Sequence, residues 1–316
     1  MSRPQRALVA LLALAGLLLL AGLLVAAASP QAPVAPEVSA AAQPAPTEGP
    51  PPATATPIAP TPTLARREFN PTFSVKVAPT SFLPGRGPEL PGAFVYAGRR
   101  LDFYVGRGTF APEEVTELAL KAEHALSYIQ KRFAVTLSER VSVGVYAASQ
   151  APGPGTRGIA YTHGETNVRI YYRSGEDQHR ALVVLSHELA HALQAEAYGK
   201  EAQRLADTVL LEGLACWISG EYWLSLYEAP SFHARARELY QAGYRGNLAA
   251  MSRNGTDVAY DMWAGFVDYL TRSYGWDAFN RLYANGRGRA PGSADYRGVY
   301  GKSFQELQEE FYATLR

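Results

Sequence analysis

One segment, residues 178–198, constrains the fold of this chain more than any other. It contains the sequence VLSHELAHALQ. Between positions 181 and 195, apart from two histidines and a glutamate, only Ser186 and Gln194 are not apolar. The pattern predicts a helix, and a helix that is apolar on nearly all sides is buried. Two histidines and a glutamate are costly to bury unless a metal ion or hydrogen-bonding partners satisfy them. Other elements must therefore surround this helix.

The polar residues of this helix are His187, Glu188 and His191, which form an H-E-x-x-H motif. Residues i and i+4 lie on one helix face, so both imidazoles can reach the same ion. Glu188 is displaced by about 100° around the helix, which places it beside the ion, where a base for an attacking water is needed. We interpret the motif as one zinc site with His187 and His191 as ligands and Glu188 as general base. The alternative is a chance match on an ordinary helix.

A third protein ligand is expected, because catalytic zinc usually takes three and keeps a fourth position open. The next predicted helix, 207–225, offers Asp207, Glu212 and Glu221. Glu212 and Glu221 are nine positions apart and would point to opposite sides of one helix. Glu212 has small neighbours and is followed by Gly213, which would allow a close approach to the zinc helix, so we select Glu212. Asp207 precedes an apolar run and is expected to cap the helix, and Glu221 is expected at the surface or beside a ligand.

His187-Glu188-x-x-His191, followed by LLEGLACW, resembles the gluzincins, in particular the thermolysin-like "peptidase MA" group of exported bacterial proteins, over roughly residues 140–285. The resemblance implies Zn²⁺, the ligands His187, His191 and Glu212, Glu188 as base, and a sheet whose edge strand binds an extended peptide. The chain does not resemble the metzincins, which would need glycine at position 194 and histidine at position 197, where this chain has Gln194 and Ala197.

The chain departs from the thermolysin pattern at Cys216, where the E-x-x-x-D sequence would have aspartate. The acid that orients a ligand histidine is therefore unidentified. Cys216 is expected to be a small buried thiol, with a fourth metal ligand as the alternative.

Tyr260 is the candidate that stabilises the oxyanion, because the resemblance places a tyrosine in this region. The alternative is that Tyr260 only packs against neighbouring aromatic rings, and His233 and His163 are the other candidates. The remaining histidines, His124 and His179, are expected to be structural or at the surface.

The order of the predicted elements favours an α+β domain over residues 66–316, with strands in 66–175 and helices in 176–316. Together with the resemblance, it predicts a thermolysin-like zincin domain in which a mixed sheet with one helix precedes the helices of the zinc site. Strand patterns cover 73–78, 99–106, 141–147 and a hairpin within 158–172, and a helix starts at Pro112. Residues 167–173 are the candidate edge strand. The later helices are predicted at 178–198, 207–225, 231–242, 257–274, 276–285 and 302–315.

The N-terminal region predicts the compartment. Arg3 and Arg6 precede 22 apolar residues, 7–28, and no further Lys or Arg occurs before Arg66. Such a stretch is long enough to span about 30 Å of hydrocarbon, with the rest of the chain outside the cytoplasm. Residues 1–28 are therefore a signal anchor or, because of the alanines at 26–28, a cleaved signal peptide. Residues 29–65 are a stalk rich in Pro, Ala and Thr that we expect to be disordered.

Composition narrows the partners. The 30 basic and 29 acidic residues give a net charge of +1, which argues against nucleic acid. The single cysteine excludes a disulfide framework. We predict an extracytoplasmic zinc peptidase, anchored to the membrane or secreted, that acts on peptides or proteins. The alternatives are a non-catalytic zinc-containing envelope-binding module on a stalk and a zinc hydrolase of a non-peptide amide.

Overall fold

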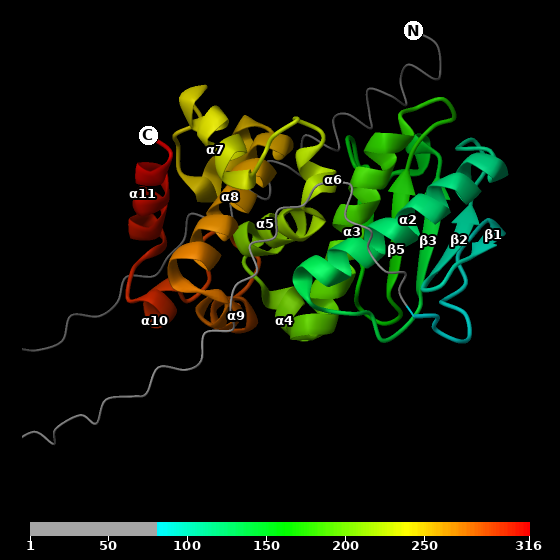
Figure 1. Ribbon diagram of the computed structural model, residues 1–316, viewed down its shortest axis with the longest axis horizontal. Helices are drawn as coiled ribbons and strands as arrows, with labels where there is room; N and C mark the ends of the chain where they lie inside the picture. The colour runs from blue at the N-terminus through cyan, green and yellow to red at the C-terminus, as the bar shows by residue number, and fades with distance from the viewer. Residues whose placement is uncertain (1–80) are drawn as a thin grey trace, which may run out of the picture. The chain divides into compact units, whose positions relative to one another are not determined.

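The computed structural model describes residues 81–316 (Figure 1). The chain divides into two units, 1–65 and 66–316, and the description below concerns the second. The expected signal anchor or peptide, the stalk and the strand at 73–78 lie outside the described residues. Within residues 81–316, no helix combines the length and apolar character needed to cross a membrane.

A five-stranded mixed sheet forms the first half of the domain, in the order β1-β2-β3-β5-β4. The strands are β1 (Ala93–Ala97), β2 (Leu101–Val105), β3 (Val141–Tyr146), β4 (Gly158–Tyr161) and β5 (Asn167–Tyr171). The three inner strands are parallel to one another, and β1 and β4 pair antiparallel at the edges.

The prediction that residues 167–173 form the edge is wrong. Strand β5 pairs with β3 on one side and with β4 on the other. The hairpin turn, in which Gly164 has φ +76°, folds β4 back onto the outer side of β5. Burial agrees with this order, because Val168 and Ile170 of β5 are fully buried whereas β4 is half-buried. The edge of the sheet on this side is therefore β4, and β1 forms the opposite edge.

Two long helices, α2 (Pro112–Phe133) and α3 (Gln178–Tyr198), pack against the sheet and each other. Helix α2 contacts β1 and β2, and α3 contacts β4 and β5. On its opposite side α3 contacts α5 (Thr208–Ser219), so it lies between the sheet and the helical half (Figure 1). This middle position explains why α3 is apolar on nearly every side.

The second half is helical, and the predicted helices agree with it in most places. Two short helices, α4 and α10, were not predicted. The remaining helices and the short 3₁₀ segments are α4 (Lys200–Leu205), α6 (Glu221–Leu224), α7 (Phe232–Gln241), α8 (Thr256–Tyr274), α9 (Trp276–Ala284), α10 (Tyr296–Tyr300), α11 (Phe304–Thr314), η2 (Ala148–Gln150) and η3 (Leu248–Asn254).

The prediction of one continuous helix at 207–225 is wrong, because Gly220 separates α5 from α6. Gly220 has φ +58° and ψ −121°, a backbone conformation that residues with a Cβ rarely adopt. A Cβ at this position would also collide with the Tyr128 hydroxyl. The chain turns here, so Glu212 and Glu221 do not share a helix.

The sequence suggested that Gly213 lets α5 come close to α3. In the structure Gly213 instead allows a close approach to α8. A Cβ at Gly213 would lie 2.6 Å from the Trp263 carbonyl oxygen. Helix α5 is thus held between α3 and the backbone of α8, with Glu212 next to this contact.

We expect Gly213→Ala to lower the free energy of unfolding by about 1–3 kcal/mol through overpacking, although alanine favours a helix over glycine by about 1 kcal/mol. Chemical denaturation measures the difference. Gly246→Ala is the control and should change the free energy of unfolding little, because a Cβ at this position would meet no atom within 4 Å. A Gly213→Ala variant more stable than the wild type would contradict the close approach.

Candidate metal centre

Helix α3 places the two histidines of the motif on one face, one turn apart. Asp177 caps the start of this helix by accepting a hydrogen bond from the His179 N–H. His187 and His191 are 4% and 9% exposed, and their Nε2 atoms lie 3.2 Å apart. Both imidazoles therefore direct the same ring nitrogen to one point.

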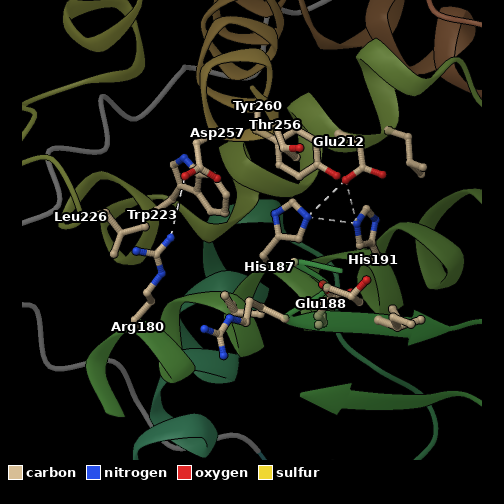
Figure 2. Close-up of a pocket in the computed structure, with 18 of the residues that line it drawn as sticks. Arg180, His187, Glu188, His191, Glu212, Trp223, Leu226, Thr256, Asp257 and Tyr260 are labelled. Carbon is tan, nitrogen blue, oxygen red and sulfur yellow. Dashed lines mark hydrogen bonds and ion pairs between the residues drawn. The ribbon is translucent and has the colours of Figure 1, made fainter. Parts of the chain in front are cut away.

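Glu212 of α5 completes a three-atom cluster. Its Oε2 lies 3.3 Å from His187 Nε2 and 3.4 Å from His191 Nε2. Two ligand atoms bound to one tetrahedral zinc ion at about 2.05 Å lie about 3.3 Å apart. The three ligand atoms thus have the spacing that a tetrahedral ion requires, and Figure 2 shows the three side chains converging.

The other two acids considered as ligands lie elsewhere. Asp207 caps α5, as predicted, by accepting from the Val209 N–H. Its carboxylate also accepts from the main-chain N–H groups of Gly292 and Ala294 and from the Tyr296 hydroxyl. It therefore ties the segment before α10 to the start of α5.

Glu221 begins α6 and is 8% exposed. Burial raises the pKa of its carboxyl, and the charge of Arg132 opposes this rise. Glu221 does not line the cleft that contains His187 and His191. Neither Asp207 nor Glu221 belongs to the cluster.

The far side of each imidazole has a different partner. His191 Nδ1 lies 3.1 Å from Gln194 Oε1, and Gln194 is fully buried. The same Oε1 accepts from the Tyr283 hydroxyl at 3.1 Å, and Gln194 Nε2 donates to the Leu211 carbonyl at 2.9 Å. Gln194 thus holds the His191 ring in place and joins α3 to α5 beside Glu212.

His187 Nδ1 faces the Cys216 sulfur at 3.5 Å. Cys216 is a buried thiol, as expected, and burial raises its pKa well above the usual value. A thiol is a weak hydrogen-bonding partner, so His187 is held less firmly than His191. Sequence reasoning missed the role of Gln194. The available signal was a glutamine three positions after His191 in an otherwise apolar helix.

Electrostatics link Glu212 to the histidines. Burial alone would raise the pKa of Glu212, but the charge of His191 and the hydrogen bonds with both imidazoles bring it well below its usual range. Burial likewise disfavours charge on His191, yet attraction to Glu212 outweighs it and raises the pKa of His191 to about 9. The Glu212 carboxylate therefore stays charged and favours a positive charge at the point where the two imidazoles meet.

Glu188 lies beside the cluster, next to the edge strand β4. Its carboxylate accepts a hydrogen bond from the Ala160 N–H, although burial has the larger effect and raises its pKa. A Cβ at Gly158 would lie 2.5 Å from Glu188 Oε1 and 2.7 Å from Val184 Cγ1. Only glycine at position 158 therefore leaves room for the Glu188 side chain.

Tyr260 of α8 and Glu188 lie on opposite sides of the cluster of His187, His191 and Glu212 (Figure 2). Its ring stacks on His187 with centroids 5.5 Å apart and an interplanar angle of 14°. Burial, followed by the charge of Glu212, raises the pKa of Tyr260 far above its usual value, so the hydroxyl keeps its proton and can donate it in a hydrogen bond. It also packs on Trp223 and Trp263, as the alternative interpretation expected.

The remaining histidines lie outside the cleft that contains the cluster. His163 is exposed in the loop between β4 and β5. His233 lies in α7 beside Arg237. His124 and His179 contact Tyr222 and Ser225, in agreement with the structural or surface role expected for them. His163 and His233 are thus not placed to act as oxyanion donors at this cluster.

A cleft of about 570 Å³ contains the cluster. Strand β4 and the loop before it form one wall, and α5, α6 and the start of α8 form the other. At one end Arg180 of α3 lies 3.8 Å from Asp257 of α8 (Figure 2). The cluster is therefore buried on its protein side and open to a ligand on the other.

No protein-family model matches this chain, and no curated protein matches it either.

We expect Gln194→Leu to weaken zinc binding by roughly tenfold to a hundredfold, because the His191 ring loses the partner that orients it. Competition with a chromophoric chelator measures the affinity. Tyr283→Phe is the control, since it removes only one hydrogen bond to the same oxygen and leaves Gln194 next to His191. Unchanged affinity in a folded Gln194→Leu variant would show that Gln194 does not orient His191.

Proposed function

We propose that the protein is a zinc-dependent peptidase of the gluzincin type with a thermolysin-like fold. The observation that carries the proposal is the triangle of His187, His191 and Glu212 ligand atoms, with edges of 3.2–3.4 Å, open to a cleft in which the Glu188 carboxylate stands beside it. The mixed sheet followed by helices is compatible with such a fold. The N-terminal sequence supports a place outside the cytoplasm, anchored by residues 1–28 or secreted.

The ligand set supports zinc in particular. Two neutral imidazoles and one carboxylate are a common set for catalytic zinc, which keeps a further position open. When bound, the ion would polarise the scissile carbonyl and lower the pKa of a water molecule. Glu188, held by the Ala160 N–H, would take the proton of that water and pass it to the leaving nitrogen. The Tyr260 hydroxyl would donate a hydrogen bond to the developing oxyanion.

The edge strand β4 supports a peptide as substrate. The Tyr171 N–H donates to the Arg157 carbonyl, so Arg157 faces β5. In an antiparallel pair the direction of the main-chain groups alternates along the strand. The Gly158 N–H and the carbonyl groups of Gly158 and Ala160 therefore point away from β5, toward the cleft, whereas the Ala160 N–H is already bonded to Glu188. An extended peptide could pair with this edge while its scissile bond lies at the cluster.

The zinc and the base can be tested separately. We expect one zinc ion per chain by elemental analysis, and peptide hydrolysis that stops with a chelator and returns with zinc. Glu188→Gln should keep the zinc and lose roughly a hundredfold to ten-thousandfold in rate, because an amide cannot take the proton. Wild-type activity in this variant would exclude Glu188 as the base. Zinc binding without hydrolysis of any peptide would favour the envelope-binding module or the hydrolase of a non-peptide amide.

The third ligand is tested by one chemical change at two positions. Glu212→Gln should weaken zinc binding and activity together, because the cluster loses its only charged ligand. Glu221→Gln is the matched control and should leave zinc content unchanged, since Glu221 lies outside the cleft.

Asp207→Ala should lower the free energy of unfolding by at least about 2 kcal/mol, because buried donors lose their acceptor. The folded fraction should still bind zinc. Loss of zinc from folded Asp207→Ala, with Glu212→Gln still loaded, would move the protein to the aspartate-ligated zincins.

A further inference from the structure

The cleft has two distinct ends, which follow from the direction of α3. Arg180, His187 and His191 all line the cleft, and a rise of 1.5 Å per residue places Arg180 roughly 10 Å before His187 along the helix axis. Beyond His191, Gln203 Nε2 donates to the His191 main-chain carbonyl, and Gln203 Oε1 accepts from the Thr162 hydroxyl. Strand β4 therefore runs beside α3 from the Arg180 end to the Gln203 end.

At the Arg180 end, the arginine charges are compensated. Arg157 forms an ion pair with Glu176 at 3.0 Å, and Arg180 faces Asp257 at 3.8 Å. Neither arginine offers an unopposed charge to a ligand in the cleft.

Arg289 lines the cleft at the Gln203 end, and its charge is not compensated. Within residues 81–316 no carboxylate lies within ion-pair distance of its guanidinium. Two neighbouring arginines do have acidic partners: Arg204 pairs with Glu201, and Arg287 pairs with Asp295. The side chain is exposed, so an incoming group can reach it.

The backbone around Arg289 is fixed. Its carbonyl accepts from the Thr208 hydroxyl at 2.5 Å, and the preceding Gly288 N–H donates to the Leu205 carbonyl at 2.8 Å. The guanidinium Nε donates to the Arg204 carbonyl at 3.1 Å. One side of the guanidinium is thus held against the end of α4, while its terminal nitrogens remain available.

We propose that Arg289 forms a subsite for a carboxylate of the substrate, on the His191 side of the scissile bond. This inference rests on the proposed peptidase function and adds a substrate class to it. The planar guanidinium presents paired N–H donors that match a carboxylate. The carboxylate comes from an aspartate or glutamate side chain or from the C-terminus of the peptide, and the two sources share the same chemistry.

The test uses the zinc-loaded full chain and pairs of peptides that differ only in Glu or Gln at each position around the cleavage site. We expect kcat/KM to favour the Glu peptide by about tenfold or more at one position, since hydrogen bonds to charged groups are the stronger ones. Arg289→Ala should abolish the preference, and Arg289→Glu should reverse it in favour of the Gln peptide. Arg287→Ala is the matched control and should keep it. Peptides with free and amidated C-termini separate the sources: amidation lowers kcat/KM in an Arg289-dependent way if the terminus is bound, whereas the Glu preference appears if a side chain is bound.

Binding to zinc-loaded Glu188→Gln, measured by calorimetry with the same peptides, separates the subsite from the chemistry. If the wild type cleaves Glu and Gln peptides equally at all positions and amidation has no effect, the subsite is wrong and the peptidase proposal stands. If binding of acidic peptides depends on Arg289 but no peptide is cleaved, the subsite stands and the peptidase proposal falls. Unchanged zinc content and melting temperature of the Arg289 variants show that each effect arises in the cleft.

Discussion

Two buried imidazoles and a partly buried carboxylate lie within 3.4 Å of one another, and the rest of the domain depends on this cluster. Such groups are stable away from water only when each has a partner. Helix α3 must therefore be covered by the sheet on one side and by α5 on the other, and α5 must bring Glu212 to the histidines. The contact of Gly213 with the main chain of α8 fixes α5 from behind. Gln194 and Cys216 occupy the remaining ring nitrogens.

The features that could be predicted from the sequence depend on local geometry. The helix at 178–198 agrees with α3 at both ends, because its apolar run and its Asp177 cap are short-range signals. The α+β order of strands and then helices is also confirmed by the structure. Glu212 was chosen from helical geometry and from its small neighbours, and the structure places its carboxylate next to both histidines although the predicted helix is broken. Glu212 lies within the unbroken part of that helix, before Gly220, so the error affected only Glu221.

The remaining features depend on contacts between distant segments. The sequence of β4 does not reveal that it takes the edge, because the order is decided by which strand of the hairpin pairs with β3, and that strand is β5. Gly220 ends α5 where an apolar pattern continues, because its backbone conformation turns the chain, and the nearby Tyr128 hydroxyl of α2 leaves no room for a Cβ there. Asp207 was recognised as a cap, but three of its four partners lie more than eighty positions later in the chain. Arg289 gave no sequence signal, because its neighbours also include arginines and only their ion pairs distinguish them.

The Cys216 thiol gives the molecule an unusual property. It is the single sulfhydryl of the chain, is fully inaccessible, and lies 3.5 Å from His187 Nδ1. An alkylating reagent can reach it only when the elements packed around α5 open, and the rate of such a reaction reports the free energy of local opening. The alkylation rate of Cys216 in the natural chain, without any engineered label, therefore measures how often the structure around His187 opens.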